Sequence, residues 1–384
     1  MTKQSKDSGV VDLIREVDSQ LKSVHTQSLD ISFNELADMI KERELDISPD
    51  YQRLFLWSEG ARSRFIESLL LEMPVPPIYV VEEEDNKKLL IDGLQRLSSF
   101  LHFIGMLDAP HLKVPVRKGE KLVLQDCDII KSLNGKTYDD LGTALQIKLK
   151  RSFVRVEVVR KGSNPKFKYY MFKRLNTGGE ALTDQQLRNC TIRLLDPRFN
   201  DFVIRLADHN QNFKTCISTI SEEQIYGAYD KELVLRFFAL KNWLSCFKHD
   251  VSDFMTDYME AVSDPDHPES FDYQKEEDVF NLTFSILEKT LNDKAFSRAN
   301  QKKNDLIRGF GVYHYEAFTI GIQPFLNKLD VSSLEGRRMV KDLLTSIKLD
   351  PKFIDLTTGG GKNSPGPLKD RINFVKNRLT AANL

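Results

Sequence analysis

The segment DGLQR, residues 92–96, places polar groups at the start of an expected helix. The preceding run LLI is typical of a buried strand, and the apolar spacing that follows is typical of a helix. Asp92 can cap this helix, Gln95 can act as its reciprocal partner, and Gly93 permits a tight turn. Arg96 lies in the first turn, where an exposed cation opposes the helix dipole by about 0.3–1 kcal/mol. An anion bound at this helix end reverses the sign, so the segment is either a capped turn or a phosphate site.

Two other segments carry polar groups outside any regular period. Tyr51, Gln52 and Arg53 combine aromatic, amide and guanidinium groups, which suit a nucleotide base or a phosphate. The alternative is a surface turn anchored in the core by its aromatic rings. A glycine turn between two expected helices forms either a backbone nest for phosphate or a plain linker. This turn consists of Asn176, Thr177, Gly178 and Gly179.

A basic stretch precedes the glycine turn. The run NPKFKYYMFKRL is expected to be a helix that begins at Pro165, and its cations alternate with Tyr169 and Tyr170. Cations interleaved with aromatic rings can follow the phosphate backbone of DNA, whereas the other interpretation is a solvated helix face. The candidate DNA-binding residues are Lys166, Lys168, Lys173 and Arg174.

The elements that must position these groups fall into three regions. Residues 1–25 are expected to form a polar arm, residues 26–195 a mixed α/β domain, and residues 196–384 a mainly helical lobe without a convincing strand. In the mixed domain the segment 28–48 predicts strand, helix and strand. The region 105–150 resembles an insertion with short mixed elements. Capping boxes are expected at Ser32 with Glu35 and at Thr183 with Gln186, a further helix N-cap at Ser58, and strands at 78–81, 89–91 and 152–160.

Composition limits the classes of function. The chain has 384 residues and a net charge of −1, so any contact with nucleic acid must come from a local patch. Its four cysteines are widely spaced and its histidines show no metal-ligating spacing, so neither a disulfide framework nor a metal site is expected. No stretch approaches the roughly 20 apolar residues that cross a bilayer. We therefore expect a cytoplasmic protein.

The order of the motifs resembles the N-terminal domain of GmrSD-type restriction endonucleases. The motifs are DYQRLFLW, MPVPPIYV, LLIDGLQRLSSF and FKRLNTGGEALTDQQLRN, and the resemblance covers roughly residues 26–195. That family is related to the ParB/sulfiredoxin fold. The resemblance therefore implies an α+β chain in which a ParB/sulfiredoxin-like domain precedes the helical lobe.

The resemblance also implies roles for residues that match the family's motifs. In GmrSD-like proteins the Asp-Gly-Gln-Gln-Arg motif is tied to binding and hydrolysis of a nucleoside triphosphate (NTP), with Mg²⁺ as its expected companion. Asp92, Gln95 and Arg96 are then the catalytic residues, and Gly93 belongs to the phosphate-binding turn. The other implied phosphate-binding residues are Tyr51, Gln52 and Arg53 upstream, and Asn176, Thr177, Gly178 and Gly179 downstream.

Two departures from the family pattern leave three functions open. Leu94 stands where the family usually has the first glutamine, which weakens hydrolysis if that glutamine orients water. Residues 196–384 contain no matched pair of HNH nuclease half-motifs. The first hypothesis is an NTP-hydrolysing, DNA-directed protein of prokaryotic defence, acting as a homo-oligomer or with a separate nuclease. The second is a non-catalytic nucleotide or DNA sensor, and the third is metal-dependent DNA nicking by the ParB-like domain itself.

Overall fold

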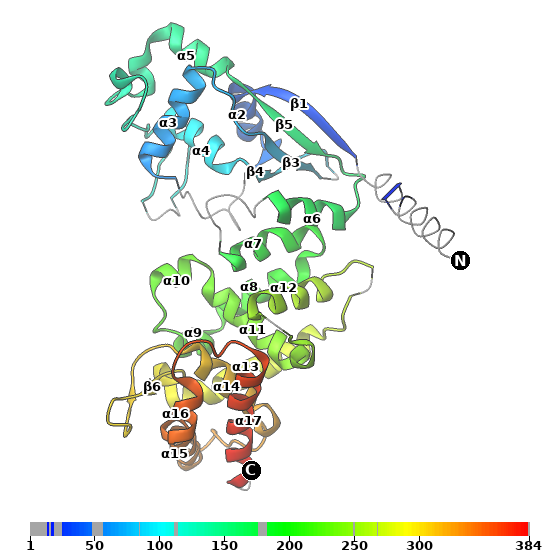
Figure 1. Ribbon diagram of the computed structural model, residues 1–384, viewed down its shortest axis with the longest axis vertical. Coiled ribbons are helices and arrows are strands. Elements are labelled where there is room, and N and C mark those ends of the chain that lie inside the picture. The colour runs from blue at the N-terminus through cyan, green and yellow to red at the C-terminus, as the bar shows by residue number, and fades with distance from the viewer. Residues whose placement is uncertain are drawn as a thin grey trace, which may run out of the picture. The chain divides into compact units, whose positions relative to one another are not determined.

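The computed structural model is shown in Figure 1. The chain divides into two compact units, 1–182 and 183–384, and each is described by itself. The expected arm lies almost wholly outside the described residues, and the expected domain boundary after residue 195 stays a prediction. The structure describes residues 14, 17–18, 25–47, 57–83, 85–110, 114–175, 183–248, 250–266 and 268–382.

The first unit is built on a five-stranded mixed sheet with the strand order β1-β5-β3-β4-β2. The β1 strand is antiparallel to β5, β5 is parallel to β3, β3 is antiparallel to β4, and β4 is parallel to β2. The predicted mixed α/β architecture is thereby confirmed. The strands are β1 (Thr26–Ser32), β2 (Leu45–Asp46), β3 (Ile78–Glu82), β4 (Lys88–Asp92) and β5 (Phe153–Val159).

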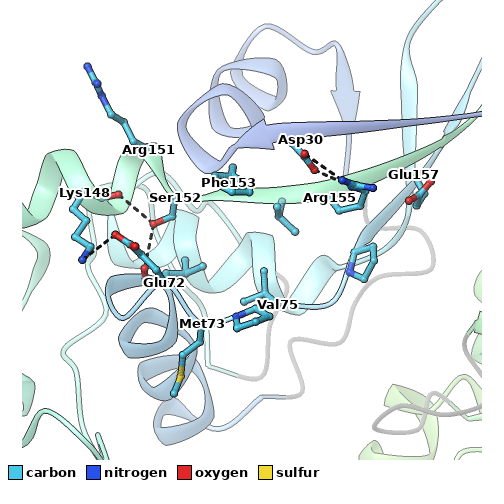
Figure 2. A pocket seen from close by; sticks show the side chains of 14 residues that line it. Asp30, Glu72, Met73, Val75, Lys148, Arg151, Ser152, Phe153, Arg155 and Glu157 are labelled. Carbon is cyan, nitrogen blue, oxygen red and sulfur yellow. Dashed lines mark hydrogen bonds and ion pairs between the residues drawn. The ribbon is translucent and has the colours of Figure 1, made fainter.

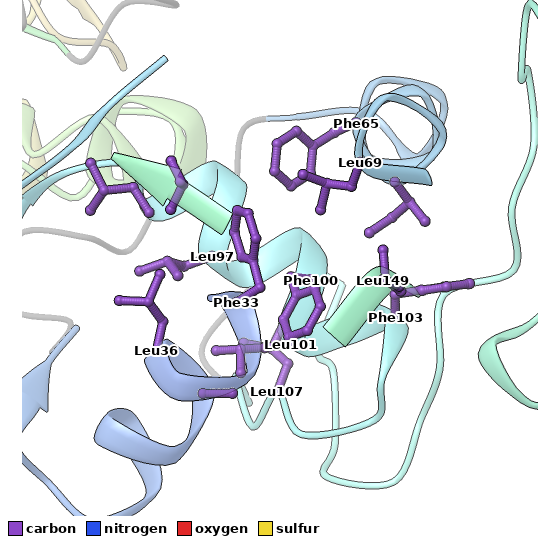
Figure 3. Packing of buried hydrophobic residues seen from close by; sticks show 14 of the residues in the cluster. Phe33, Leu36, Phe65, Leu69, Leu97, Phe100, Leu101, Phe103, Leu107 and Leu149 are labelled. Carbon is purple, nitrogen blue, oxygen red and sulfur yellow. The ribbon is translucent and has the colours of Figure 1, made fainter. Parts of the chain in front are cut away.

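Helices cover the two faces of this sheet. On one face the alternating side chains of Val154, Val156 and Val158 are buried against Phe33 and Phe100, as the period of two in the sequence predicts (Figure 3). On the other face α6 contacts β4. The helices of the unit are α2 (Phe33–Lys41), α3 (Glu59–Leu70), α4 (Leu94–Phe103), α5 (Gly142–Arg151) and α6 (Pro165–Leu175), with the 3₁₀ turns η1 (Lys131–Leu133) and η2 (Tyr138–Leu141).

A buried carboxylate ties the expected insertion, residues 105–150, to the sheet domain. Glu67 on α3 is 3% exposed and accepts the backbone N–H groups of Asp128, Ile129 and Ile130 at 3.1, 3.0 and 2.5 Å. Three N–H donors compensate the desolvation of one buried carboxylate. The insertion is therefore fixed to α3 at this point.

Most of the predicted helix caps are present. The Ser58 side chain accepts the Ala61 amide at the start of α3, and Thr183 and Gln186 form a complete capping box. At α2 the Ser32 hydroxyl accepts the Glu35 amide, but only this half of the expected box is formed. One capping oxygen already satisfies an otherwise unpaired N–H group, so the helix begins at the predicted residue.

The second unit is helical, as expected, with one correction. The prediction that it holds no strand is wrong, because β6 (Arg298–Ala299) pairs antiparallel with β7 (Leu306–Ile307). Two-residue strands are too short to produce a period in the sequence. The helices and 3₁₀ turns are α7 (Asp184–Thr191), η4 (Ile192–Leu194), α8 (Pro197–His209), α9 (Gln211–Cys216), α10 (Glu222–Tyr226), α11 (Tyr229–Trp243), η5 (Leu244–Cys246), α12 (Val251–Val262), α13 (Tyr273–Leu291), η6 (Asn292–Lys294), α14 (Val312–Gly321), η7 (Gln323–Phe325), α15 (Leu334–Leu349), α16 (Pro351–Thr357) and α17 (Pro365–Ala381).

Among the described residues no helix is both long and apolar enough to cross a membrane.

A buried ion network crosses the core of the second unit. Glu316 on α14 is fully buried and accepts bonds from Arg236 Nη1 at 2.7 Å and from Arg371 Nε at 3.0 Å. The Arg371 guanidinium also lies 4.4 Å from the centre of the Tyr313 ring. Arg371 belongs to α17, whose apolar residues Leu368, Ile372, Val375 and Leu379 are buried. The network thus links three helices through one carboxylate.

A lysine in the same unit, Lys348, is buried, and no carboxylate of the described residues forms an ion pair with it. The Lys348 Nζ atom lies 3.4 Å from both His314 Nδ1 and the Ser297 carbonyl oxygen, and 4.2 Å from the centre of the Phe318 ring. Burial lowers the pKa of Lys348 to about 7 and holds the pKa of His314 well below its usual value. The Lys348 amine therefore releases its proton on folding at alkaline pH.

We predict that this proton release makes stability depend on pH. The unfolded lysine binds a proton up to its ordinary pKa of 10.5, whereas the folded one does so only up to about 7. Unfolding free energy should therefore rise with pH through this window, by up to about 1.4 kcal/mol per pH unit. Lys348→Met should remove this slope and raise stability at pH 7. Chemical denaturation between pH 7 and 10 measures both effects.

The matched control is Lys341→Met, which replaces an exposed lysine of the same helix. It should leave the slope of the wild-type curve unchanged. Parallel curves for wild type and Lys348→Met would contradict the prediction.

Candidate functional site

The turn that follows β4 requires a glycine. Gly93 has a φ of +109°, which lies in the left-handed region that other residues rarely adopt. A Cβ atom at this position would lie 2.8 Å from Cγ1 of Ile78. Backbone conformation and space therefore exclude a side chain at residue 93.

The capping box expected at Asp92 and Gln95 is wrong. Gly93 is the N-cap of α4, no side chain caps this helix, and Asp92 is still the last residue of β4. The left-handed glycine shifts the start of the helix by one residue, so the Asp92 carboxylate cannot reach the first-turn amides. Gln95 Oε1 instead accepts the Trp57 amide at 3.2 Å.

Arg96 is held by two groups from neighbouring strands. Its Nη2 atom donates to Asp92 Oδ2 at 2.9 Å and to the Pro77 carbonyl oxygen at 3.0 Å. The side chain is 12% exposed, and its Nε atom is buried without a hydrogen-bond partner among the described residues. Asp92 ends β4 and Pro77 precedes β3, so one nitrogen fastens both strands. The pair also offsets the unfavourable interaction between Arg96 and the helix dipole, because Asp92 supplies the compensating negative charge.

A second cation, Arg62 on α3, contacts α4 through His102. Both backbone groups of Trp57 are held, the N–H by Gln95 and the C=O by Arg62 Nε at 3.1 Å. Arg62 Nη1 lies 3.0 Å from His102 Nδ1. Burial, and next the Arg62 charge, lower the pKa of His102 to about 4, so His102 is neutral at pH 7 and accepts this bond. Sequence reasoning missed both residues because no motif spacing marks them.

The structure gathers only part of the predicted site. Tyr51, Gln52 and Arg53 lie outside the described residues. So do Asn176, Thr177, Gly178 and Gly179. The described residues on either side of residues 48–56 have defined partners. The β2 strand runs parallel to β4, with Asp46 opposite Leu89, and Trp57 is bonded to Gln95. The β2 strand thus runs in the direction of Asp92 without reaching its row, and Trp57 lies beside the first turn of α4.

The cations of α6 separate onto different faces. Lys166, Tyr170 and Lys173 are spaced four and three residues apart, so they share one helix face, and Arg174 is next to them. Tyr170 is 47% exposed and Arg174 is exposed. The Lys168 ammonium instead donates to the Lys161 carbonyl oxygen at 3.1 Å. Three of the four predicted DNA-binding residues therefore lie together.

A groove of about 890 Å³ lies in the first unit along the start of β5 (Figure 2). Its charged walls are largely neutralised, because Arg155 pairs with Asp30 at 2.8 Å and Lys148 with Glu72 at 3.0 Å. Pro77, whose carbonyl group binds Arg96, lines the groove. The other lining residues are Leu69, Met73, Pro74, Val75, Arg151, Ser152, Phe153, Val154 and Glu157.

The fold and the turn together define the first unit as a mixed α/β domain with a strand–glycine–helix turn at one end of its sheet. Residues 34–193 match the family model described as GmrSD restriction endonuclease, N-terminal domain. The resemblance noted in the sequence is confirmed to that extent, and the sulfiredoxin-like fold stays a prediction. No curated protein and no solved structure matches the chain.

We predict that Gly93→Ala is markedly destabilising. The variant adds a Cβ atom in close conflict with Ile78 as well as left-handed strain, and such overpacking costs about 1–3 kcal/mol beyond the backbone term. Gly119→Ala is the matched control, since Gly119 has a φ of +99° and open space around it. Thermal or urea unfolding of both variants checks the prediction. Equal losses would show that Ile78 imposes no constraint.

Proposed function

We propose that this protein binds a nucleoside triphosphate at residues 92–96 and hydrolyses it in a DNA-directed reaction of restriction against foreign DNA. The observation that carries the proposal is Arg96, which lies beside the uncapped N-terminus of α4 with its Nε atom buried and unpaired. The amides of an uncapped helix N-terminus, with a guanidinium group in the same first turn, favour an anion. The match to the restriction endonuclease family model supports the DNA-directed part.

The Arg96 bridge suits phosphate binding because it fixes the guanidinium group in advance. The Pro77 carbonyl group and Asp92 hold Nη2, which leaves the other two nitrogens without a bond to the described residues. An arginine already ordered in the free protein loses little side-chain entropy on binding. Phosphoryl transfer depends mainly on such positioning and on charge neutralisation.

In this proposal Asp92 orients water or a metal ion, and Gln95 keeps Trp57 in place beside the turn. Tyr51, Gln52 and Arg53, together with the turn 176–179, enter through the family motifs they match. Magnesium bound to nucleotides commonly uses only one or two protein carboxylates plus phosphate oxygens. Asp92 fits that role. Among the described residues no group of three potential metal ligands lies together, so the fit is to a metal that arrives with a nucleotide.

A second candidate function is nucleotide sensing without hydrolysis. Two observations favour it. The Asp92 carboxylate is already paired with Arg96, and Leu94 is half-buried and packs against the core of the first unit. Position 94 therefore offers no polar group to a water molecule. Binding without turnover would select this function.

We predict that Arg96→Ala abolishes nucleotide turnover by the purified protein, with a loss of about 100-fold or more, since a lost charge-stabilising donor has effects of this size. Phosphate release and calorimetry with the four NTPs measure hydrolysis and binding separately. Arg96→Lys keeps a charge and tests whether the forked guanidinium group is needed. Melting curves show whether each variant is folded.

Arg117→Ala is the control, because Arg117 is an exposed arginine of the same unit away from the turn. Equal turnover in wild type and a folded Arg96→Ala would remove the site assignment. Tight binding with no turnover in the wild type would leave the sensing function.

For DNA we propose the α6 face formed by Lys166, Lys173 and Arg174. We predict that the double change of Lys173 and Arg174 to alanine weakens DNA binding and lowers the slope of log affinity against log salt by about 1 for each lost phosphate contact. Fluorescence anisotropy with a labelled duplex at several salt concentrations measures both. Lys118→Ala, an exposed lysine elsewhere in the unit, is the control. An unchanged slope would exclude this face.

A further inference from the structure

The groove of Figure 2 is a gap in the sheet beside β5. The β5 strand pairs with β1 from Phe153 onward, but its pairing with β3 begins only at Val156. The chain before β3 reads MPVPP, and proline offers no N–H group for a sheet ladder. The first part of β5 therefore has an open edge that faces the groove.

Phe153 presents three recognition groups at this edge. The Phe33 amide donates to the Ser152 carbonyl at 2.9 Å, and the Arg160 amide donates to the His25 carbonyl at 2.8 Å. In an antiparallel ladder the hydrogen-bonding pairs alternate, so the backbone N–H and C=O of Phe153 point away from β1. The Phe153 ring is 67% exposed. A donor, an acceptor and an aromatic face are what a flat heterocycle needs for recognition.

The other end of the groove reaches the Arg96 bridge. Pro77 lines the groove and accepts the Arg96 bond. Tyr79 is paired with Asp92 on one side and with Glu157 on the other, so these three residues share one row across the sheet. From Glu157 to Phe153 the strand rises by about 13 Å. Asp92 lies two strand spacings, about 10 Å, across the sheet from Glu157, so a nucleotide that reaches from the turn to Phe153 runs diagonally over β3 and β5 for about 16 Å.

Glu157 stands between these ends. One oxygen of its carboxylate accepts the Ser28 hydroxyl at 2.5 Å. The other can accept from a sugar hydroxyl, as acidic residues do at many ribose sites. Two of the three cations that line the groove, Arg155 and Lys148, are paired with Asp30 and Glu72, and the third, Arg151, is exposed, so most of the positive charge of the groove is neutralised.

We infer that the groove binds the sugar and base of the nucleotide whose phosphates lie at the turn, with Phe153 stacked on the base. The inference rests on the proposed function and adds to it the subsite that selects a nucleotide over inorganic polyphosphate. The apolar walls of Met73, Val75 and Pro74 exclude water from the base, which strengthens the stacking.

Calorimetry with each of the four NTPs and with inorganic tripolyphosphate tests the subsite. Phe153→Ala should weaken the binding of NTP by about 5- to 100-fold, the range for loss of one base–aromatic stack, and leave tripolyphosphate binding unchanged. Phe153→Trp should restore NTP binding. Arg96→Ala should weaken both ligands. Ile129→Ala, an exposed apolar residue of the same unit outside the groove, is the control and should change neither.

The outcomes separate the two proposals. NTP affinity that is equal in wild type and Phe153→Ala overturns the groove assignment while the phosphate site stands. If the wild type binds tripolyphosphate but no NTP, the groove assignment is likewise overturned while the phosphate site stands. No binding of either ligand to the wild type overturns the proposed function and, with it, the groove assignment.

Discussion

The first unit depends on one shared nitrogen, Nη2 of Arg96. This atom joins the last residue of β4, through Asp92, to the residue before β3, through the Pro77 carbonyl group. The two strands are neighbours, and the glycine at residue 93 lets α4 begin close enough for the bridge to form. The turn, the groove wall at Pro77 and the direction of α4 follow from this contact. A phosphate at the turn would meet a guanidinium group that the fold has already oriented.

The two units use buried arginines differently. In the second unit Glu316 binds Arg236 and Arg371 inside the core. That arrangement holds helices together and presents nothing to solvent, since each of these side chains is at most 10% exposed. Arg96 lies at the end of a sheet instead, where its Nη2 atom bonds Asp92 and the Pro77 carbonyl group. The Nε atoms of both Arg96 and Arg236 are buried without a hydrogen-bond partner among the described residues, so the two arginines differ in what surrounds the guanidinium group rather than in the pairing of Nε.

Local signals predicted most of the elements, and long-range pairing explains what the sequence did not reveal. The valines of β5 alternate, and the Ser58 and Thr183 caps have their usual spacing, so each could be found within a few residues. The cap at Asp92 failed because a left-handed glycine moved the helix start. The groove depends on how far β3 extends along β5, more than 70 residues away. No pattern within either segment records that length.

The strand order also determines when the first strand can enter the sheet during synthesis of the chain. The β5 strand lies between β1 and β3, and β1 has no other partner in the sheet. Synthesis must therefore reach Val159 before all of β1 can pair. Until then the hydrophobic faces of α2, α3 and α4 lack the side chains of β5 against which they pack. The groove is completed only when β5 has been made, since Phe153, Val154, Arg155 and Glu157 form one of its sides, whereas the contacts of the turn lie within residues 77–96.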